Sequence, residues 1–431
     1  MAPYDIYQQV FALSMASNLI HNEQGPLSKL QTEIETCLAG ALPMIGKWSV
    51  AWGPVVYQDK ENTNKAPDNV WYVAKQPQVL FSDSPTPMDT YVVAIAGTCE
   101  NSDYDWKTED LDVGNVVDVN AWIKAGLLSP PTAATNVKAS ANLNPYISMG
   151  TALGVSILLT TPVPTDGGAV GGGSRLGDFL ESVPSTARII FTGHSLGGAL
   201  SPTLAFTWWK SSMARNVTLG NVLTYPTAGP SPGNDMFASD FRTTFPYLAA
   251  GPVGYQKWNS NLVNTLDVVP LAWCTDASVE PLYNLHRIPS FDNVQPSNPG
   301  IDWATLTVAV NLLILRADSS EIVYRPLTPN TTFVGQGQQP ISTPDDTFQQ
   351  LPQLPQWEKD ASYHHVDEYF IEMMGFPMPP VPEKQPLDLK VDYLRTARWP
   401  VLSAIIGVAG DPQVRAEVEK LHAEQAKQAI K

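Results

Sequence analysis

A serine flanked by glycines offers the clearest chemistry in the sequence. Residues 193–198 read Gly-His-Ser-Leu-Gly-Gly, with Ser195 at the centre of a Gly-x-Ser-x-Gly pattern. This pattern is typical of a nucleophilic serine on a sharp turn between a strand and a helix. The backbone of such a turn is strained, so the residues beside the serine need small side chains. The flanks agree, because an apolar stretch at 187–192 precedes the turn and a helix-forming stretch at 198–210 follows it.

A serine hydroxyl is a weak nucleophile until a base removes its proton, and histidine is the usual base. The chain has six histidines, at positions 21, 194, 286, 364, 365 and 422. His194 lies inside the turn and should point away from the Ser195 hydroxyl. His21 and His422 fall in predicted terminal helices, and His286 could be a core or a site residue. The pair His364-His365 is a candidate for the base, with a structural role as the equally open alternative.

A carboxylate must orient the imidazole of such a base. Asp267 follows a predicted strand in Asn-Thr-Leu-Asp-Val-Val-Pro, residues 264–270. Functional groups gather at the carboxyl ends of strands in α/β sheets. The alternative for Asp267 is a turn or capping residue. The order Ser195, Asp267, His365 is the chain order of α/β-hydrolases.

Composition limits the classes of partner. The chain has 431 residues, of which 43% are hydrophobic and 16% charged, and this excludes disorder over most of its length. The net charge of −16 disfavours nucleic acids and anionic membrane surfaces. The longest apolar run, at 149–163, is too short to span a bilayer. Three widely spaced cysteines form no zinc pattern and allow one disulfide at most.

Strands and helices alternate along the middle of the chain, which favours a largely parallel α/β sheet. The expected strands are 48–57, 70–74, 91–96, 187–192, 221–224, 258–264 and 321–327. The expected helices are 4–21, 28–38, 146–159, 175–182, 198–210, 301–317 and 411–431. The glycine-rich stretch 165–174 predicts a flexible connector, and 335–355 predicts a loop.

Several blocks, taken in order, resemble the class 3 lipases, the α/β-hydrolase branch that includes the filamentous-fungal triacylglycerol lipases. The blocks are Tyr-Val-Val-Ala-Ile-Ala-Gly-Thr at 91–98, Asp-Trp at 105–106, Asp-Leu at 110–111, the serine turn within 188–200, Pro-Ser-Pro-Gly-Asn-Asp-Met-Phe within 225–237, Val-Asn-Thr-Leu-Asp-Val-Val-Pro at 263–270, and His-Val-Asp-Glu-Tyr at 365–369. The resemblance covers about residues 48–370 with insertions.

The resemblance implies Ser195 as nucleophile, Asp267 as orienting acid and His365 as base. It implies an oxyanion hole made by the backbone N–H groups of Thr98 and Leu196. It also implies an α/β-hydrolase fold: a mostly parallel central sheet with helices on both faces, here with added helices at both ends. Two departures stand out. Ala96 replaces the family's arginine, and 97 residues separate Asp267 from His365.

These observations favour a serine ester hydrolase of the lipase or esterase type, which cleaves lipid or neutral acyl esters through an acyl-enzyme. Phospholipase, small-ester or feruloyl-type esterase and acylglycerol lipase remain open. A catalytically silent lipase-like binding protein is the alternative from another class. No metal or organic cofactor is implied. The expected partners are the ester substrate and a transient lipid interface, with no nucleic acid and no transmembrane segment.

Three further expectations concern organisation and access. The chain divides into an N-terminal helical segment (1–45), a hydrolase domain (46–375) with an insertion at about 276–360, and a proline-rich, helical C-terminal extension (376–431). No signal peptide is visible, which predicts a cytoplasmic protein if the chain is complete and a secreted one if a leader was removed. The apolar residues of 99–131, Trp122 among them, either form a mobile lid over the acyl pocket or pack in the core.

Overall fold

The computed structural model describes residues 4–290, 301–327, 331–333 and 361–375, apart from positions 61, 64, 100, 103, 142 and 212. The predicted loop at 335–355, the predicted helix at 411–431 and the C-terminal extension lie outside these residues. The strands are β1 (Ser49–Tyr57), β2 (Asn69–Val79), β3 (Met88–Ile95), β4 (Val116–Asp118), β5 (Tyr146–Ser148), β6 (Arg188–His194), β7 (Val222–Thr227), β8 (Gly233–Asn234), β9 (Leu248–Ala249), β10 (Lys257–Trp258), β11 (Leu262–Asn264), β12 (Tyr324–Arg325) and β13 (Thr331–Phe333).

The helices are α1 (Ile6–Ala16), α2 (Leu27–Ile45), α3 (Val119–Ala125), α4 (Val137–Ser140), α5 (Met149–Thr160), α6 (Leu176–Ser182), α7 (Leu196–Lys210), α8 (Asp235–Thr244), α9 (Ile301–Asp318) and α11 (Glu368–Met374). Short helical turns lie at η1 (Asp105–Asp110), η2 (Leu219–Asn221), η3 (Val269–Leu271), η4 (Leu285–Ser290) and η5 (Tyr363–Asp367).

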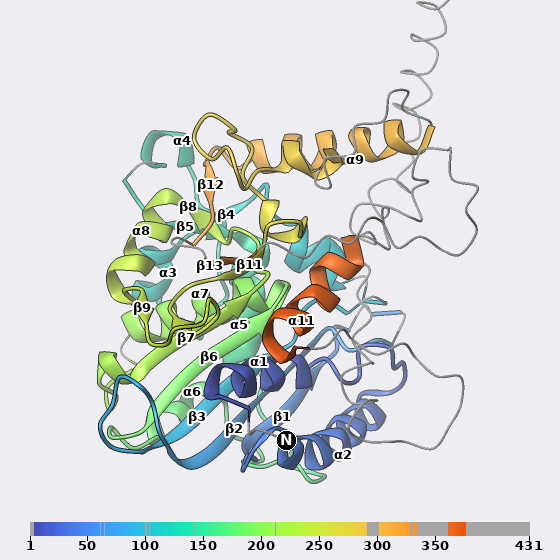
Figure 1. Ribbon diagram of the computed structural model, residues 1–431. Coiled ribbons are helices and arrows are strands. Elements are labelled where there is room, and N and C mark those ends of the chain that lie inside the picture. Colours follow the sequence, from blue (N-terminus) through green and yellow to red (C-terminus); the bar gives the residue numbers. More distant parts are fainter. Residues whose placement is uncertain are drawn as a thin grey trace, which may run out of the picture.

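A seven-stranded sheet organises the molecule, in the order β1-β2-β3-β6-β7-β11-β13 (Figure 1). β1, β2 and β3 pair antiparallel, and every pairing from β3 to β13 is parallel. The carboxyl ends of β3, β6, β7 and β11 therefore meet at one edge, where α/β sheets place their functional groups. This mainly parallel sheet confirms the predicted fold class.

The side chains of alternate residues in the central strands pack into two separate hydrophobic cores. Val92 and Ala94 face one core, whereas Val93 and Ile95 face the other. Helices α1, α2 and α11 cover the first face, and α5, α6 and α7 contribute to the core on the second (Figure 1). Because both faces are buried, β3 and β6 are apolar along their length rather than alternating.

The N-terminal helices share the core of the sheet rather than standing apart from it. Val10, Phe11 and Leu13 of α1 are fully buried and belong to the same cluster as Ala96 at the end of β3. Asp5 caps α1, since its side chain accepts the Gln8 backbone N–H at 2.9 Å while the Gln8 side chain accepts the Asp5 N–H at 2.8 Å. α1 is thus fixed at its start and along its buried face.

Two predicted elements divide in the structure. The stretch 146–159 begins as strand β5, which pairs with β4 and β8, before α5 starts at Met149. The predicted strand 258–264 separates into β10 and β11, because Asn259 has a positive φ of 60° that a strand cannot contain. The predicted strand at 321–327 shortens to the two residues of β12.

Most apolar residues of 99–131 pack inside the molecule, as the core-packing alternative predicts, whereas Leu128 is 43% exposed. Trp122 is 4% exposed, and its indole N–H donates to the Ser129 carbonyl oxygen at 2.9 Å. Val116, Val117 and Leu127 are also buried, and β4 joins a four-stranded sheet with β5, β8 and β12. This packing agrees with the core-packing alternative, and movement of the segment as a lid stays a prediction.

The glycine-rich stretch at 165–174 is held by its neighbours. The backbone groups of Gly53 and Val170 bond each other reciprocally, at 2.9 and 2.7 Å, and the Gly168 N–H donates to Glu35 at 2.8 Å. This stretch is therefore hydrogen-bonded to both β1 and α2, and it does not form the free connector that the sequence predicted.

All three cysteines are free thiols, so the optional disulfide does not form. Within the described part of the chain, no helix is long and apolar enough to cross a membrane.

Candidate active site

Ser195 sits on a strained turn at the carboxyl end of β6. Its φ of 60° and ψ of −124° lie outside the regions that side chains normally allow, and α7 begins at the next residue. The Ser195 backbone N–H donates to the Thr227 carbonyl oxygen of neighbouring β7 at 3.1 Å. The turn is thus anchored to the sheet, and the positive end of α7 points at the serine.

The flanking glycines are required by close backbone approach. A β-carbon on Gly193 would collide with the carbonyl of Gly197, across the turn. One on Gly197 would collide with the Ile95 carbonyl oxygen and lie 2.7 Å from that of Ala96. The start of α7 therefore packs directly against the end of β3, which brings the Thr98 loop beside Ser195.

The structure brings His365 and Asp267 together as a buried pair. The imidazole Nδ1 lies 3.0 and 2.9 Å from the two carboxylate oxygens, and both side chains are essentially inaccessible. Asp267 follows β11, and its Oδ1 also accepts the Val269 backbone N–H at 2.9 Å. Because Nδ1–H donates to the carboxylate, Nε2 of a neutral His365 carries the lone pair that a general base needs.

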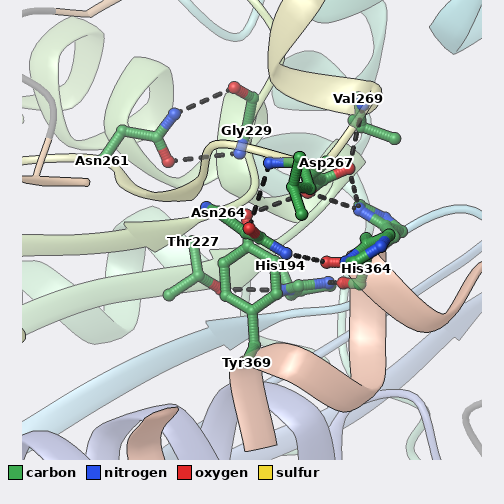
Figure 2. Close-up of polar contacts among 11 residues, drawn as sticks. His194, Thr227, Gly229, Asn261, Asn264, Asp267, Val269, His364 and Tyr369 are labelled. Carbon is green, nitrogen blue, oxygen red and sulfur yellow. Dashed lines mark hydrogen bonds and ion pairs between the residues drawn. The ribbon is translucent and has the colours of Figure 1, made fainter. Parts of the chain in front are cut away.

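Tyr369 supplies a second side-chain donor to Asp267 (Figure 2). Its hydroxyl donates to Asp267 Oδ2 at 2.8 Å and accepts the Asn264 backbone N–H at 3.0 Å. His365 and Tyr369 are four residues apart, so η5 and α11 present both side chains on one face. Burial, followed by the nearby Asp267 charge, raises the pKa of the Tyr369 hydroxyl well above its usual value, which keeps it a donor.

His194 links the serine turn to the histidine segment. Its Nδ1 lies 2.8 Å from the Thr227 hydroxyl, and its Nε2 lies 2.8 Å from the His365 carbonyl oxygen (Figure 2). Burial, and secondarily His365, lowers the pKa of His194 well below its usual value, so the ring is neutral. Nε2 must then donate to the carbonyl and Nδ1 accept from Thr227. The two imidazole centroids are 4.7 Å apart.

The remaining histidines have other surroundings. The His364 carbonyl oxygen accepts the Asn264 side-chain amide at 2.9 Å, and burial lowers the pKa of the His364 ring to about 4. His286 contacts the Thr275 carbonyl oxygen at an exposed position, and burial lowers the pKa of His21 to about 3. His422 lies outside the described residues. Of the candidate bases, His365 is the one bonded to Asp267.

Thr98 lies in the loop after β3, and Leu196 is the first residue of α7. These two segments are in contact at Gly197. Thr98 and Leu196 are both buried. No hydrogen bond joins the backbone N–H of either residue to another part of the chain that the structure describes. The Thr98 hydroxyl donates to Asp110 Oδ2 at 2.8 Å. Burial raises the pKa of Asp110 to about 7, against the opposing effect of this hydrogen bond.

Further carboxyl groups lie buried near the Thr98 loop. Asp105 accepts the Cys99 backbone N–H at 2.8 Å, and Glu109 accepts the Asn69 side chain at 3.0 Å. Burial raises the pKa of Asp105 well above its usual value and that of Glu109 to about 8. Over the residues that can be placed, no group of three or more histidine, cysteine or acidic side chains is arranged to hold a metal ion.

Comparison with known proteins agrees with this geometry. Residues 173–275, which include Ser195 and Asp267, match the family described as Lipase (class 3). This match supports a class 3 lipase relationship over these residues, and with it lipid ester hydrolysis by a lipase-type hydrolase as the activity class. A search of curated proteins finds no match.

Solved structures that resemble this chain include lipases. M37 lipase is 21% identical with a TM-score of 0.59, over 97% of this chain and 100% of its own, which shows a shared fold. A mono- and diacylglycerol lipase of Aspergillus oryzae is 16% identical with a TM-score of 0.31, over 62% of this chain and 71% of its own. A lipase of Rhizopus microsporus var. chinensis is 13% identical with a TM-score of 0.32, over 62% and 69%.

The sequence did not predict the polar groups that support the candidate site. Tyr369 was visible as the end of a motif, and its spacing from His365 could have indicated a shared partner. Thr227 and Asn264 carry no such signal, because their contacts join segments that lie far apart in the sequence.

Proposed function

We propose that the protein is a serine carboxylester hydrolase for lipid or neutral acyl esters, with Ser195 as nucleophile, His365 as base and Asp267 as orienting acid. The observation that carries this proposal is the buried His365–Asp267 pair beside the strained Ser195 turn. His194, adjacent to Ser195 in the chain, bonds the His365 backbone, so turn and base are held by one contact.

In the proposed reaction, His365 Nε2 takes the Ser195 proton as the serine oxygen attacks the ester carbonyl. The imidazolium then gives this proton to the leaving alcohol, and an acyl-serine remains. Water, deprotonated by the same nitrogen, releases the carboxylic acid and restores the serine. Asp267 keeps Nδ1–H directed away from the serine and stabilises the transient positive charge.

Charge develops on the ester carbonyl oxygen during both steps. In the proposal, the backbone N–H groups of Thr98 and Leu196 bind this oxyanion. Each donor of this kind contributes roughly 3–4 kcal/mol of transition-state stabilisation. Among the described residues, neither N–H group donates a hydrogen bond within the chain, and this supports the proposed role.

A fluorophosphonate that phosphonylates active serines tests the proposal. We expect stoichiometric labelling of Ser195 and complete loss of p-nitrophenyl ester hydrolysis. Ser195→Ala should neither label nor turn over substrate. Ser201→Ala, which alters a buried serine one and a half turns along α7, is the matched control and should retain both properties.

Labelling at another serine, or activity that survives in Ser195→Ala, would overturn the proposed nucleophile. A folded wild-type protein that neither labels nor hydrolyses esters would instead indicate a lipase-like binding protein. A series of p-nitrophenyl esters and triglycerides of increasing chain length, with and without an interface, then separates lipase from esterase.

A further inference from the structure

The three residues of the loop after β3 are each held by a different partner. The Gly97 backbone N–H donates to Asn18 Oδ1 at 2.9 Å. The Cys99 N–H donates to Asp105 at 2.8 Å, and the Thr98 hydroxyl to Asp110 at 2.8 Å. The peptide groups on either side of the Thr98 N–H are therefore fixed, while that N–H is left available.

Asn18 is a fully buried residue whose side-chain oxygen and nitrogen both form hydrogen bonds in this arrangement. It follows α1 on a hydrogen-bonded turn, and its exposed fraction is 0%. Its side-chain nitrogen donates to the Ser14 and Met15 carbonyl oxygens, at 3.2 and 3.3 Å. These two carbonyls fix the orientation of the amide, since only its oxygen can then accept the Gly97 N–H.

Helix α1, which precedes Asn18, is held in place by several contacts. The Tyr72 hydroxyl of β2 donates to the Leu13 carbonyl oxygen at 2.8 Å. Phe11 of α1 packs against Phe370 of α11, with ring centroids 5.2 Å apart, and α1 and α11 lie side by side (Figure 1). The N-terminal segment thus touches both the Thr98 loop and the helix that follows His365.

We infer that Asn18 is a positioning residue for the oxyanion hole, which it sets by holding the Gly97 peptide and thereby the adjacent Thr98 N–H. This inference rests on the proposed function. A donor that is already aimed at the developing charge requires no reorientation during the reaction. An amide in a side chain 79 positions away supplies that orientation.

Asn18→Leu tests this role, because leucine has a similar volume but accepts no hydrogen bond. We expect kcat for a short p-nitrophenyl ester to fall about 10- to 100-fold, less than for removal of an oxyanion donor itself, with KM changed less than about threefold. The inhibition constant of an aryl trifluoromethyl ketone should rise by a similar factor. Ser195 adds to that ketone and forms a hemiketal oxyanion, so its binding reports the hole directly.

Gln9→Leu is the matched control for loss of a polar contact in α1. The Gln9 side chain accepts the Trp48 indole N–H at 2.8 Å and donates to the Tyr4 carbonyl oxygen, away from the Thr98 loop. We expect a fall in melting temperature comparable to that of Asn18→Leu, with kcat and ketone inhibition within about twofold of wild type. Equal kinetic losses in both variants would mean a structural role only and would overturn the inference.

The Asn18→Asp variant adds a second measurement, the pH dependence of kcat, which a change in packing alone would not alter. A neutral carboxyl offers an acceptor and one donor in place of the amide's two N–H donors, whereas a carboxylate offers no donor and faces two carbonyl oxygens. The ratio of variant to wild-type kcat should therefore rise as the pH is lowered from 8 to 5. This variant also serves if Asn18→Leu does not fold. A ratio that is constant with pH and close to one would overturn the inference.

Two different outcomes distinguish failure of this inference from failure of the proposed function. If the wild type does not bind the ketone and Ser195→Ala remains active, the proposed function fails. If the wild type binds the ketone and Asn18→Leu behaves as wild type, only the role of Asn18 fails.

Discussion

His364 and His365 are neighbours in the chain, yet only His365 bonds Asp267. His365→Ala should lower kcat/KM by about three orders of magnitude or more, because the base is lost. His364→Ala should lower it much less, since the His364 backbone carbonyl that binds Asn264 is retained. Ester hydrolysis by the two purified variants decides this. The opposite ranking would move the base by one residue.

The Tyr369→Phe variant lacks the hydroxyl that donates a hydrogen bond to Asp267. The variant leaves Asp267 Oδ2 without its tyrosine donor and the Asn264 N–H without its acceptor. We expect unfolding to become easier by about 1–3 kcal/mol, as for other buried groups left unsatisfied. The pH dependence of kcat should shift as well, because His365 is then the one side-chain donor to Asp267 among the described residues. Urea denaturation and a pH–rate profile measure the two effects, and an unchanged profile would confine Tyr369 to stability.

At the level of elements, the contact between α7 and β3 sets the distance between the serine turn and the Thr98 loop. Gly197→Ala would drive its β-carbon into the Ile95 and Ala96 carbonyls, which are backbone atoms and cannot turn aside. We expect kcat to fall at least about tenfold, together with a lower melting temperature, since a small misplacement of catalytic groups is costly.

Gly220→Ala is the control for this prediction. Gly220 lies in η2, where a β-carbon would meet nothing within 4 Å. This variant should match wild type in activity and melt at the same or a slightly higher temperature. Wild-type kinetics in Gly197→Ala would show that the Thr98 loop tolerates displacement and would weaken the proposed oxyanion hole.

For the whole molecule, buried ionisable groups predict how stability changes with pH. Burial raises the pKa of Glu109 to about 8 and of Asp110 to about 7, so the folded protein holds these protons to higher pH than the unfolded chain. Stability from these groups is therefore lost as the pH rises. Buried His21 and His364, with lowered pKa values, act in the opposite direction, but only below pH 6.5, their usual value.

Between about pH 6.5 and 8 the carboxyl groups should dominate, and the melting temperature should fall as the pH rises. Glu109→Gln should flatten this slope, because glutamine can still accept from Asn69 without taking on charge. Glu181→Gln, at an exposed position, should leave the slope unchanged. Thermal melts across this range measure the slopes. A wild-type curve that rises with pH would mean that these carboxyls do not control stability.

The sequence by itself determined the features that depend on local pattern. Glycine spacing around Ser195 predicted the turn, because only small residues permit that backbone. Apolar runs predicted β3 and β6, because strands buried on both faces need no polar alternation. Asp267 and His365 were found by their place after a strand and by resemblance, and the structure brings them together.

Tertiary structure alone decided what depends on contacts between distant segments. The sequence did not show whether Trp122 is buried in the core, since an apolar residue has the same pattern in a lid and in a core; in the structure it is buried. The hydrogen bonds of Asn18 to Gly97 and of Thr227 to His194 leave no mark in the local sequence. Each joins residues that only the folded sheet brings together, and a polar side chain in a helix or loop gives no sign of its eventual partner.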